Sequence, residues 1–237
     1  MNNLWENTSK EKENFSQDPE SITTDLLIVG GGFTGCSAAL EAAKQGAKAV
    51  LLECETIGFG GSGRNVGLVN AGLWLPPKKI ISILGEEQGK SLISALASAP
   101  DLVFSIIEEN QIKCDPERNG TLHCAHSEKG MEYLSERFDQ GKIFGEPLTL
   151  INKTETENKL GSSKFFGSLH DPRAGTIHPL AYCRGLARKA KELGASIYEQ
   201  AKVFRIRKQN GMWQTYVRDV EIKSKYLLLA MNAYQDL

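Results

Sequence analysis

The sequence predicts an α/β protein built on a parallel sheet with helices packed against it. Two short apolar runs, 26–29 and 49–52, flank an alanine-rich helical segment. Continuous apolar runs are typical of parallel strands buried on both faces, and a helix between two such strands forms the crossover. A third run, 227–230, predicts a further buried strand.

Composition places the chain among ordinary globular proteins. It has 237 residues, of which 41% are hydrophobic and 24% charged, and a net charge of -1. This balance supplies no field that would attract nucleic acid or an anionic membrane surface. The five cysteines include no CxxC pair, which favours a reducing compartment, and no run of 18 apolar residues or signal peptide occurs. We therefore predict a cytoplasmic protein without a membrane span.

A glycine turn follows the first strand. Gly30, Gly32 and Gly35 form a GxGxxG motif, in which the first glycine permits the turn, the second lets the backbone approach a pyrophosphate, and the third allows close helix packing. The helix then begins with Phe33 and Thr34, where unpaired N–H groups and a partial positive charge suit a diphosphate. The turn predicts a Rossmann-like dinucleotide site.

Glu53 ends the second strand, 23 residues beyond Gly30. This is the position of an acid that binds the adenosine ribose hydroxyls, and a carboxylate there disfavours the 2′-phosphate of NADP. The ordered strand, turn, helix, strand and acid favour a dinucleotide site over an ordinary glycine turn. FAD is the preferred ligand, and NAD in the same fold is the alternative.

A second glycine-rich loop, 58–67, follows directly. It contains five glycines and the candidate binding residues Gly61, Ser62, Gly63, Arg64 and Asn65. Such a loop lets backbone N–H groups form an anion-binding concavity, and Arg64 adds positive charge. The alternative is a flexible linker, but Arg, Asn and Phe do not suit a Gly/Ser spacer.

The stretch 25–72 resembles the FAD-dependent glycine oxidase/D-amino acid oxidase family. Within it, IGFGGSGRNVGLVNAG (57–72) is most similar to the γ-glutamylputrescine oxidoreductase-like branch, as are LHDPRAGTIHPLAYCRGLARKAKELGA (169–195) and LLLAMNAY (227–234). The resemblance implies an α/β fold with an FAD/NAD(P)-binding Rossmann-like domain, which has a three-layer ββα architecture, and an inserted α+β substrate-domain segment. We assign 24–75 and 173–237 to the cofactor domain, 76–172 to the insertion, and 1–23 to a flexible N-terminal tail.

The resemblance also implies chemistry. Family members oxidise an amine C–N bond by hydride transfer to flavin, leaving an imine that water hydrolyses. Some relatives attach the flavin through a His in the second loop. This loop has no His, which implies non-covalent FAD. The region of Val203 is expected near the adenine, and the final strand is expected to return to the cofactor sheet.

The rest of the chain offers few catalytic candidates. His178 is the one titratable residue that we would test for a functional role, although a histidine that merely precedes the helix beginning at Pro179 is the competing interpretation. Its catalytic residues are otherwise unassigned. His123, Cys124 and His126 invite a metal hypothesis, but adjacent strand residues face opposite ways and a fourth ligand is missing, so we predict no metal.

The remaining predicted elements follow from periodicity. Residues 86–110 predict two helices or one bent helix around Pro100, and the basic residues of the helix after His178 are interpreted as a solvated face. Asn210-Gly211 predicts a hairpin between strands 203–206 and 212–217.

Relative to the family the chain is expected to be truncated at its C-terminus. This leaves three hypotheses: an oxidoreductase acting on a small amine or amino acid, a non-catalytic fragment or one part of an oxidase completed by a second polypeptide, and an NAD-dependent dehydrogenase.

Overall fold

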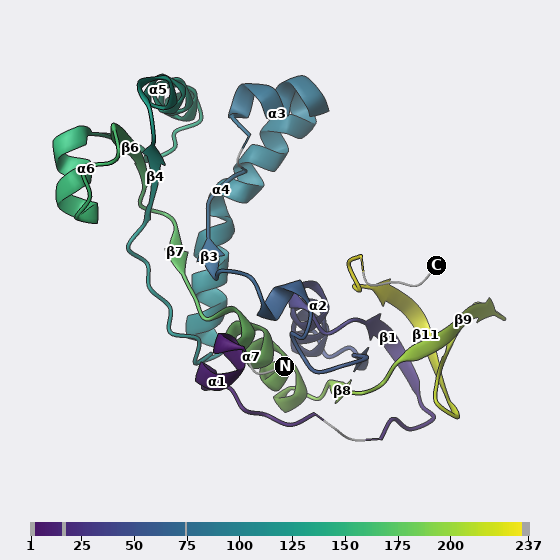
Figure 1. The fold of residues 1–237 in the computed structure, drawn as a ribbon. Helices are drawn as coiled ribbons and strands as arrows, with labels where there is room; N and C mark the ends of the chain where they lie inside the picture. The colour runs from purple at the N-terminus through teal and green to yellow at the C-terminus, as the bar shows by residue number, and fades with distance from the viewer. Residues whose placement is uncertain (1–2, 16–17, 74, 234–237) are drawn as a thin grey trace. The chain divides into compact units, whose positions relative to one another are not determined.

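A computed structural model describes residues 3–15, 18–73 and 75–233 of the chain. Tyr234, the last residue of the closing motif, and parts of the predicted tail (1–2 and 16–17) lie outside the described residues, as do residue 74 and residues 235–237. The chain forms two compact units (Figure 1). The first comprises Met1–Gly67, Ile107–Asp115 and His178–Leu237, and the second comprises Leu68–Ile106 and Pro116–Ile177.

The first unit contains a mixed sheet of six strands in the order β8-β2-β1-β11-β10-β9. Strands β8, β2, β1 and β11 run parallel, and the hairpin β9-β10 continues the sheet in antiparallel fashion. The closing strand therefore returns to the cofactor sheet, as the resemblance implied, and there it lies directly beside the first strand. The strands are β1 (Thr23–Val29), β2 (Ala49–Leu52), β8 (Ser196–Tyr198), β9 (Val203–Gln209), β10 (Met212–Val217) and β11 (Val220–Leu229).

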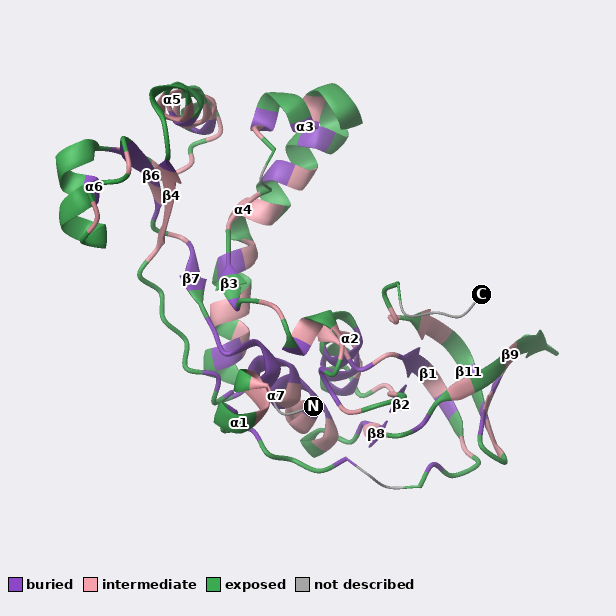
Figure 2. Ribbon diagram, viewed as in Figure 1, coloured by how far each residue is buried: buried purple, intermediate pink, exposed green. Residues whose placement is uncertain are grey.

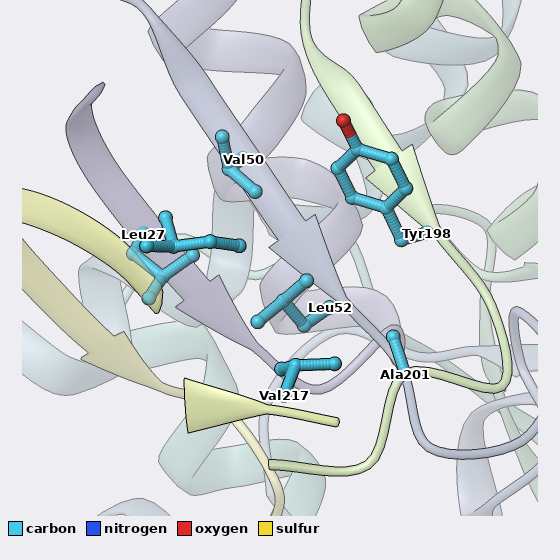
Figure 3. Close-up of a cluster of buried hydrophobic side chains, with 7 residues drawn as sticks. Leu27, Val50, Leu52, Tyr198, Ala201 and Val217 are labelled. Carbon is cyan, nitrogen blue, oxygen red and sulfur yellow. The ribbon is translucent and has the colours of Figure 1, made fainter. Parts of the chain in front are cut away.

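Apolar side chains from these strands make the core of the first unit. β1 and β2 form the buried centre of the sheet, and every residue of β2 is buried (Figure 2). Side chains from β1, β2, β8, β10 and β11, and from the segment after β8, meet in one cluster (Figure 3). Its buried members are Leu27, Val50, Leu52, Tyr198, Ala201, Val217 and Ile222. The α/β prediction is confirmed.

Two helices of the first unit, α2 (Phe33–Lys44) and α7 (Pro179–Glu192), pack against each other. Small side chains such as Ala39 and Ala187 are fully buried and permit close approach. A single 3₁₀ turn, η1 (Gly61–Gly63), lies in the second glycine loop and also contacts α7. The sheet, α2 and α7 together form the framework of the first unit.

The N-terminal segment differs from the predicted flexible tail. Residues Leu4–Thr8 form helix α1, which Asn3 caps by accepting a hydrogen bond from the Glu6 N–H (2.9 Å). Phe15 is only 1% exposed. The polar composition suggested disorder, but a capped turn and one buried aromatic ring hold this segment to the first unit.

Ion pairs fix the same segment to α7. Arg184 contacts Glu6 at 2.9 Å, and Arg188 contacts Glu11 at 2.9 Å. One turn further along, Lys191 contacts Glu13 at 2.8 Å. The interpretation of these three basic residues as a solvated face is therefore wrong, because they pair with the N-terminal segment. Lys189, which belonged to the same prediction, contacts Glu192 of its own helix at 3.1 Å.

The second unit is α+β. Its strands form an antiparallel sheet in the order β4-β6-β5 and a two-stranded pair of β3 and β7. Ala125, Leu134 and Leu169 form its core, whereas α6 is mostly exposed (Figure 2). The elements are β3 (Leu68–Val69), α3 (Pro77–Leu84), α4 (Glu86–Glu109), β4 (Thr121–Ala125), α5 (Glu128–Ile143), β5 (Thr149–Asn152), α6 (Lys153–Leu160), β6 (Gly167–Asp171) and β7 (Gly175–Thr176).

Helix α4 carries Pro100 within a single helix, so it does not divide into two at that residue. Within the described part of the chain, α4 is the one helix long and apolar enough to cross a membrane. A core helix or a signal sequence passes the same test, so this is weak evidence for a span. The compact units change after residues 67, 106, 115 and 177, whereas we placed the domain boundaries at 75 and 173 and assigned 107–115 to the insertion.

Replacing Phe15 by Ala tests the anchoring of the N-terminal segment. We expect the free energy of unfolding to fall by about 3 kcal/mol, the usual cost of emptying a buried aromatic site. Phe204→Ala is the matched control, since that ring is 63% exposed. Urea denaturation measures both, and equal losses would show that the segment is not anchored by Phe15.

Candidate cofactor site

The carboxyl ends of three parallel strands meet at one edge of the sheet. Val29 of β1 pairs with Leu52 of β2 on one side and with Leu229 of β11 on the other. The residues that follow each strand therefore gather at this edge, where α/β folds bind their ligands. These residues are the glycine turn, Glu53 and Ala230.

A cavity of about 750 Å³ opens there. Its lining comes from the ends of β1, β2 and β11, from the second glycine loop and from the start of β9. The lining residues are Val29, Gly30, Gly31, Gly32, Leu52, Glu53, Cys54, Glu55, Phe59, Gly60, Gly61, Ser62, Ala201, Lys202, Val203, Phe204, Arg205, Ile206, Leu229, Ala230, Met231 and Asn232. Its size is in the range of small-molecule and cofactor sites.

Each glycine of the turn is required for a different steric reason. Gly30 has φ +110°, and a Cβ there would lie 2.6 Å from the Ala230 carbonyl oxygen. A Cβ on Gly32 would meet the Ser62 hydroxyl oxygen at 2.8 Å, and one on Gly35 would lie 1.9 Å from the Gly30 carbonyl oxygen. Gly35 therefore sets the close approach of α2 to the turn, while Gly30 allows the close approach of Ala230 and Gly32 that of Ser62.

Helix α2 begins at this cradle. Gly32 is its N-cap and supplies no side-chain hydrogen bond, while the Phe33 N–H donates to the Ser62 hydroxyl at 2.9 Å. Thr34 is the second helical residue, and the first turn contains no acidic side chain. The positive end of the helix dipole is thus available to an anionic group such as a pyrophosphate.

Both carboxylate oxygens of Glu53 are held by backbone donors. Oε2 accepts from the Gly31 N–H at 2.6 Å, and Oε1 accepts from the Glu55 N–H at 2.9 Å. Oε1 also accepts from the Cys54 thiol at 3.3 Å, so the remaining acceptor capacity for a hydroxyl donor lies mainly on Oε2. The carboxylate is therefore oriented in advance for a diol such as a ribose.

The Gly31 carbonyl, which sequence reasoning did not single out, is also fixed. It accepts from the Gly58 N–H at 2.9 Å and from the thiols of Cys36 and Cys183 at 3.5 and 3.4 Å. The two Sγ atoms are 3.8 Å apart. The hydrogen bond with Cys183 and burial raise the pKa of Cys36, which keeps it a neutral donor. No local pattern relates two cysteines so distant in sequence.

The second glycine loop divides into residues that line the cavity and residues that shape the loop. Gly61 and Ser62 line it. Gly63 is buried, and a Cβ there would lie 2.1 Å from the Gly58 carbonyl oxygen. Arg64 stacks over Phe59 at 4.8 Å from the ring centroid, and the Asn65 amide donates to the Ser62 carbonyl at 2.8 Å. Arg64 and Asn65 hold the loop in its fold.

Val203 lines the same cavity as Glu53. The chain before it is tied to the acid, because the Ala201 N–H donates to the Glu53 carbonyl at 2.8 Å. The neighbouring lining residues Phe204, Met231 and Asn232 were not predicted. The predicted return of the last strand to the sheet was the available signal for the last two.

His178 lies outside this lining and begins α7. Its Nδ1 accepts from the Ala181 N–H at 3.1 Å, and Nε2 lies 3.1 Å from the Thr8 hydroxyl oxygen. Trp5 packs edge-on at 4.9 Å between ring centroids. Burial lowers the pKa of His178, which favours the neutral ring that an N-cap acceptor requires. Its contacts are those of a helix cap that also holds α1.

The second unit has its own cavity of about 460 Å³, lined in part by His123, Cys124 and His126. Within the described residues, no group of three or more His, Cys, Asp or Glu side chains could hold a metal ion. Burial lowers the pKa of His123. Arg173 bridges Asp171 and Glu146 at 2.7 and 3.3 Å, and this network gives the cavity a polar side.

Residues 25–237 match the sequence profile of the FAD dependent oxidoreductase family, DAO. The chain belongs to this family. It is 35% identical over 215 residues to the probable oxidoreductase OrdL of Haemophilus influenzae, covering 90% of this chain and 50% of the relative. It is 33% identical over 216 residues to γ-glutamylputrescine oxidoreductase of Escherichia coli, covering 91% of this chain and 50% of that protein.

The fold is also shared with glycine oxidase from Geobacillus kaustophilus. The TM-score is 0.75 at 23% identity, over 90% of this chain and 56% of the solved one. The chain thus spans about half the length of the curated relatives that it matches. The family resemblance is confirmed, and FAD is the cofactor of the family.

The residues present fit the adenosine and pyrophosphate part of FAD. The glycine turn lines the cavity and has no room for side chains at Gly30 to Gly32, the start of α2 offers positive charge, and Glu53 is oriented for hydroxyl donors. The assignment of individual residues to the cofactor follows from these contacts as a proposal.

Gly35→Ala tests the close approach of α2 to the turn. Because the new Cβ would lie 1.9 Å from a backbone oxygen, we expect a loss of several kcal/mol in unfolding free energy. Gly61→Ala is the matched control, since a Cβ there meets nothing within 4 Å. Thermal unfolding compares the two, and an unchanged midpoint in Gly35→Ala would contradict the steric account.

Proposed function

We propose that this chain binds FAD non-covalently at the cavity beside Glu53 and serves the oxidation of a C–N bond in a small amine or amino acid. The observation that carries the cofactor part is the pair of hydrogen bonds that orients the Glu53 carboxylate beside the glycine turn. The substrate class is supported by the relatives, among them a γ-glutamylputrescine oxidoreductase.

In this proposal each part of the site has one task. Glu53 accepts the ribose hydroxyls, the first turn of α2 faces the pyrophosphate, and Ser62 keeps its hydroxyl at the helix start. The segment around Val203 lies against the adenine. These contacts bind and orient the cofactor.

Bound FAD supplies hydride acceptance from the carbon next to the amine nitrogen, and water then hydrolyses the resulting imine. Among the described residues we assign no proton donor or acceptor for this reaction. His178 is occupied as the cap of α7, and no residue is assigned to face the substrate.

Two further points belong to the same proposal. The proposal includes a second polypeptide that completes the site; the chain spans about half the length of the relatives that it matches. The cysteines at positions 36, 54, 114, 124 and 183 are all free, which supports a reducing, cytoplasmic setting.

The visible spectrum of the purified protein tests the function. We expect a yellow protein whose flavin band bleaches when a reactive amine from a panel of amines and amino acids is added without oxygen. Acid precipitation should release the flavin into the supernatant if it is non-covalent. A colourless protein that takes up no added FAD rejects the proposal, and a yellow protein that no amine bleaches supports a binding fragment or one part of a larger oxidase.

Glu53→Ala tests the ribose contact. Loss of charge-assisted hydrogen bonds worth about 1.5–3 kcal/mol should weaken FAD binding about 10- to 100-fold. Flavin fluorescence titration of the apoprotein gives the Kd. Glu132→Ala, an exposed substitution in the second unit, is the control and should bind FAD like the wild type. Equal affinities for Glu53→Ala and wild type would exclude the assigned role.

A further inference from the structure

The segment from Glu53 to Gly58 lines the cofactor cavity with its first three residues and is held between two elements. On one side, the Glu53 N–H donates to the Tyr198 carbonyl at 2.9 Å, at the end of β8. On the other side, the Gly58 N–H donates to the Gly31 carbonyl at 2.9 Å, in the glycine turn. The position of this segment therefore fixes the distance between Glu53 and the turn.

Glu199, directly after β8, reaches across to the middle of this segment. Its Oε1 accepts a hydrogen bond from the Ile57 N–H at 2.6 Å. Its own N–H lies 3.5 Å from the Phe15 carbonyl oxygen, so the same residue also meets the anchored N-terminal segment. Glu199 does not line the cavity.

Ile57 connects Glu199 to the glycine turn. It is fully buried, and a Cβ on Gly31 would lie 2.6 Å from its Cδ1 and 3.0 Å from the Glu53 Cβ. Ile57 thus packs directly against the Gly31 backbone, whose N–H binds the Glu53 carboxylate. A shift of Ile57 displaces both groups.

The carboxylate is costly at this position. Burial raises the pKa of Glu199, and the nearby Glu53 charge adds to this, while hydrogen bonds from Ile57 and Phe15 and the charge of Arg184 oppose it. An amide oxygen would accept the Ile57 hydrogen bond without the desolvation cost of a charge, while the amide NH2 would not accept the hydrogen bond from Phe15. The hydrogen-bond acceptor, rather than the charge, is therefore what the Ile57 N–H requires.

We propose that Glu199 is a positioning residue of the cofactor site, which holds the segment Glu53–Gly58 against the glycine turn through the Ile57 N–H. This inference rests on the proposed binding of FAD beside Glu53. It concerns a residue that touches no ligand and acts through Ile57 and Gly31.

The first test compares Glu199→Ala, Glu199→Gln and the exposed control Glu20→Ala by FAD titration of the apoprotein. Removing the acceptor should weaken FAD binding about tenfold, the loss typical of one charge-assisted hydrogen bond. The Gln variant and the control should bind within about twofold of the wild type, because both keep an acceptor for Ile57. An unaffected Ala variant, or a Gln variant as weak as Ala, would overturn the proposal.

A double-mutant cycle separates positioning from general destabilisation. If Glu199 acts through Glu53, then Glu53→Ala combined with Glu199→Ala should bind FAD no more than about threefold more weakly than Glu53→Ala alone. Additive losses would overturn the proposal.

Hydrogen exchange of the apoprotein gives a readout that needs no FAD. The Ile57 amide should exchange faster in Glu199→Ala than in the wild type, and Glu199→Gln should restore its protection. If the wild type bound no FAD, the proposed function would fail, while this exchange pattern would still decide whether Glu199 holds Ile57. Unchanged exchange in Glu199→Ala would reject the positioning role.

Discussion

The cofactor edge of the first unit depends on the peptide of Gly31. Its N–H binds the Glu53 carboxylate, and its carbonyl accepts from the Gly58 N–H and from two buried thiols. The N–H and the carbonyl of this one residue thereby join the ends of β1 and β2, the second glycine loop, α2 and α7. Buried backbone groups require partners, and here the partners are the elements that shape the cavity.

Much of this edge followed from sequence because its determinants are local. The glycine spacing, the apolar runs and the acid after the second run lie within residues 25–53, and each has a steric or electrostatic reason that the structure displays. The closing strand was predicted from its apolar run to be buried, but Leu227 and Leu228 are only half-buried and Leu229 is exposed, so that part of the prediction is wrong. The family resemblance implied its return to the cofactor sheet, and its place beside β1 was not predicted. The hairpin at Asn210-Gly211 followed from its turn chemistry, and both of these residues do have positive φ.

The remaining features depend on pairs of residues that no local pattern connects. The Cys36 and Cys183 thiols converge from two helices, and Glu199 meets Ile57 across 142 residues of chain. The basic residues of α7 had an ordinary solvated interpretation until Glu6 and Glu11 were placed beside them. A polar N-terminal composition indicates disorder only when its charges have no partners elsewhere, and these do.

The anchored N-terminal segment has a consequence for where a shortened form of this protein can begin. The family match begins at residue 25, whereas Phe15 is buried in the first unit and Glu6, Glu11 and Glu13 neutralise three cations of α7. A shortened chain that begins where the family similarity begins would lack this N-terminal segment. The site of Phe15 would then be exposed next to basic residues of α7 that have lost their N-terminal partners, which is a surface prone to non-specific association.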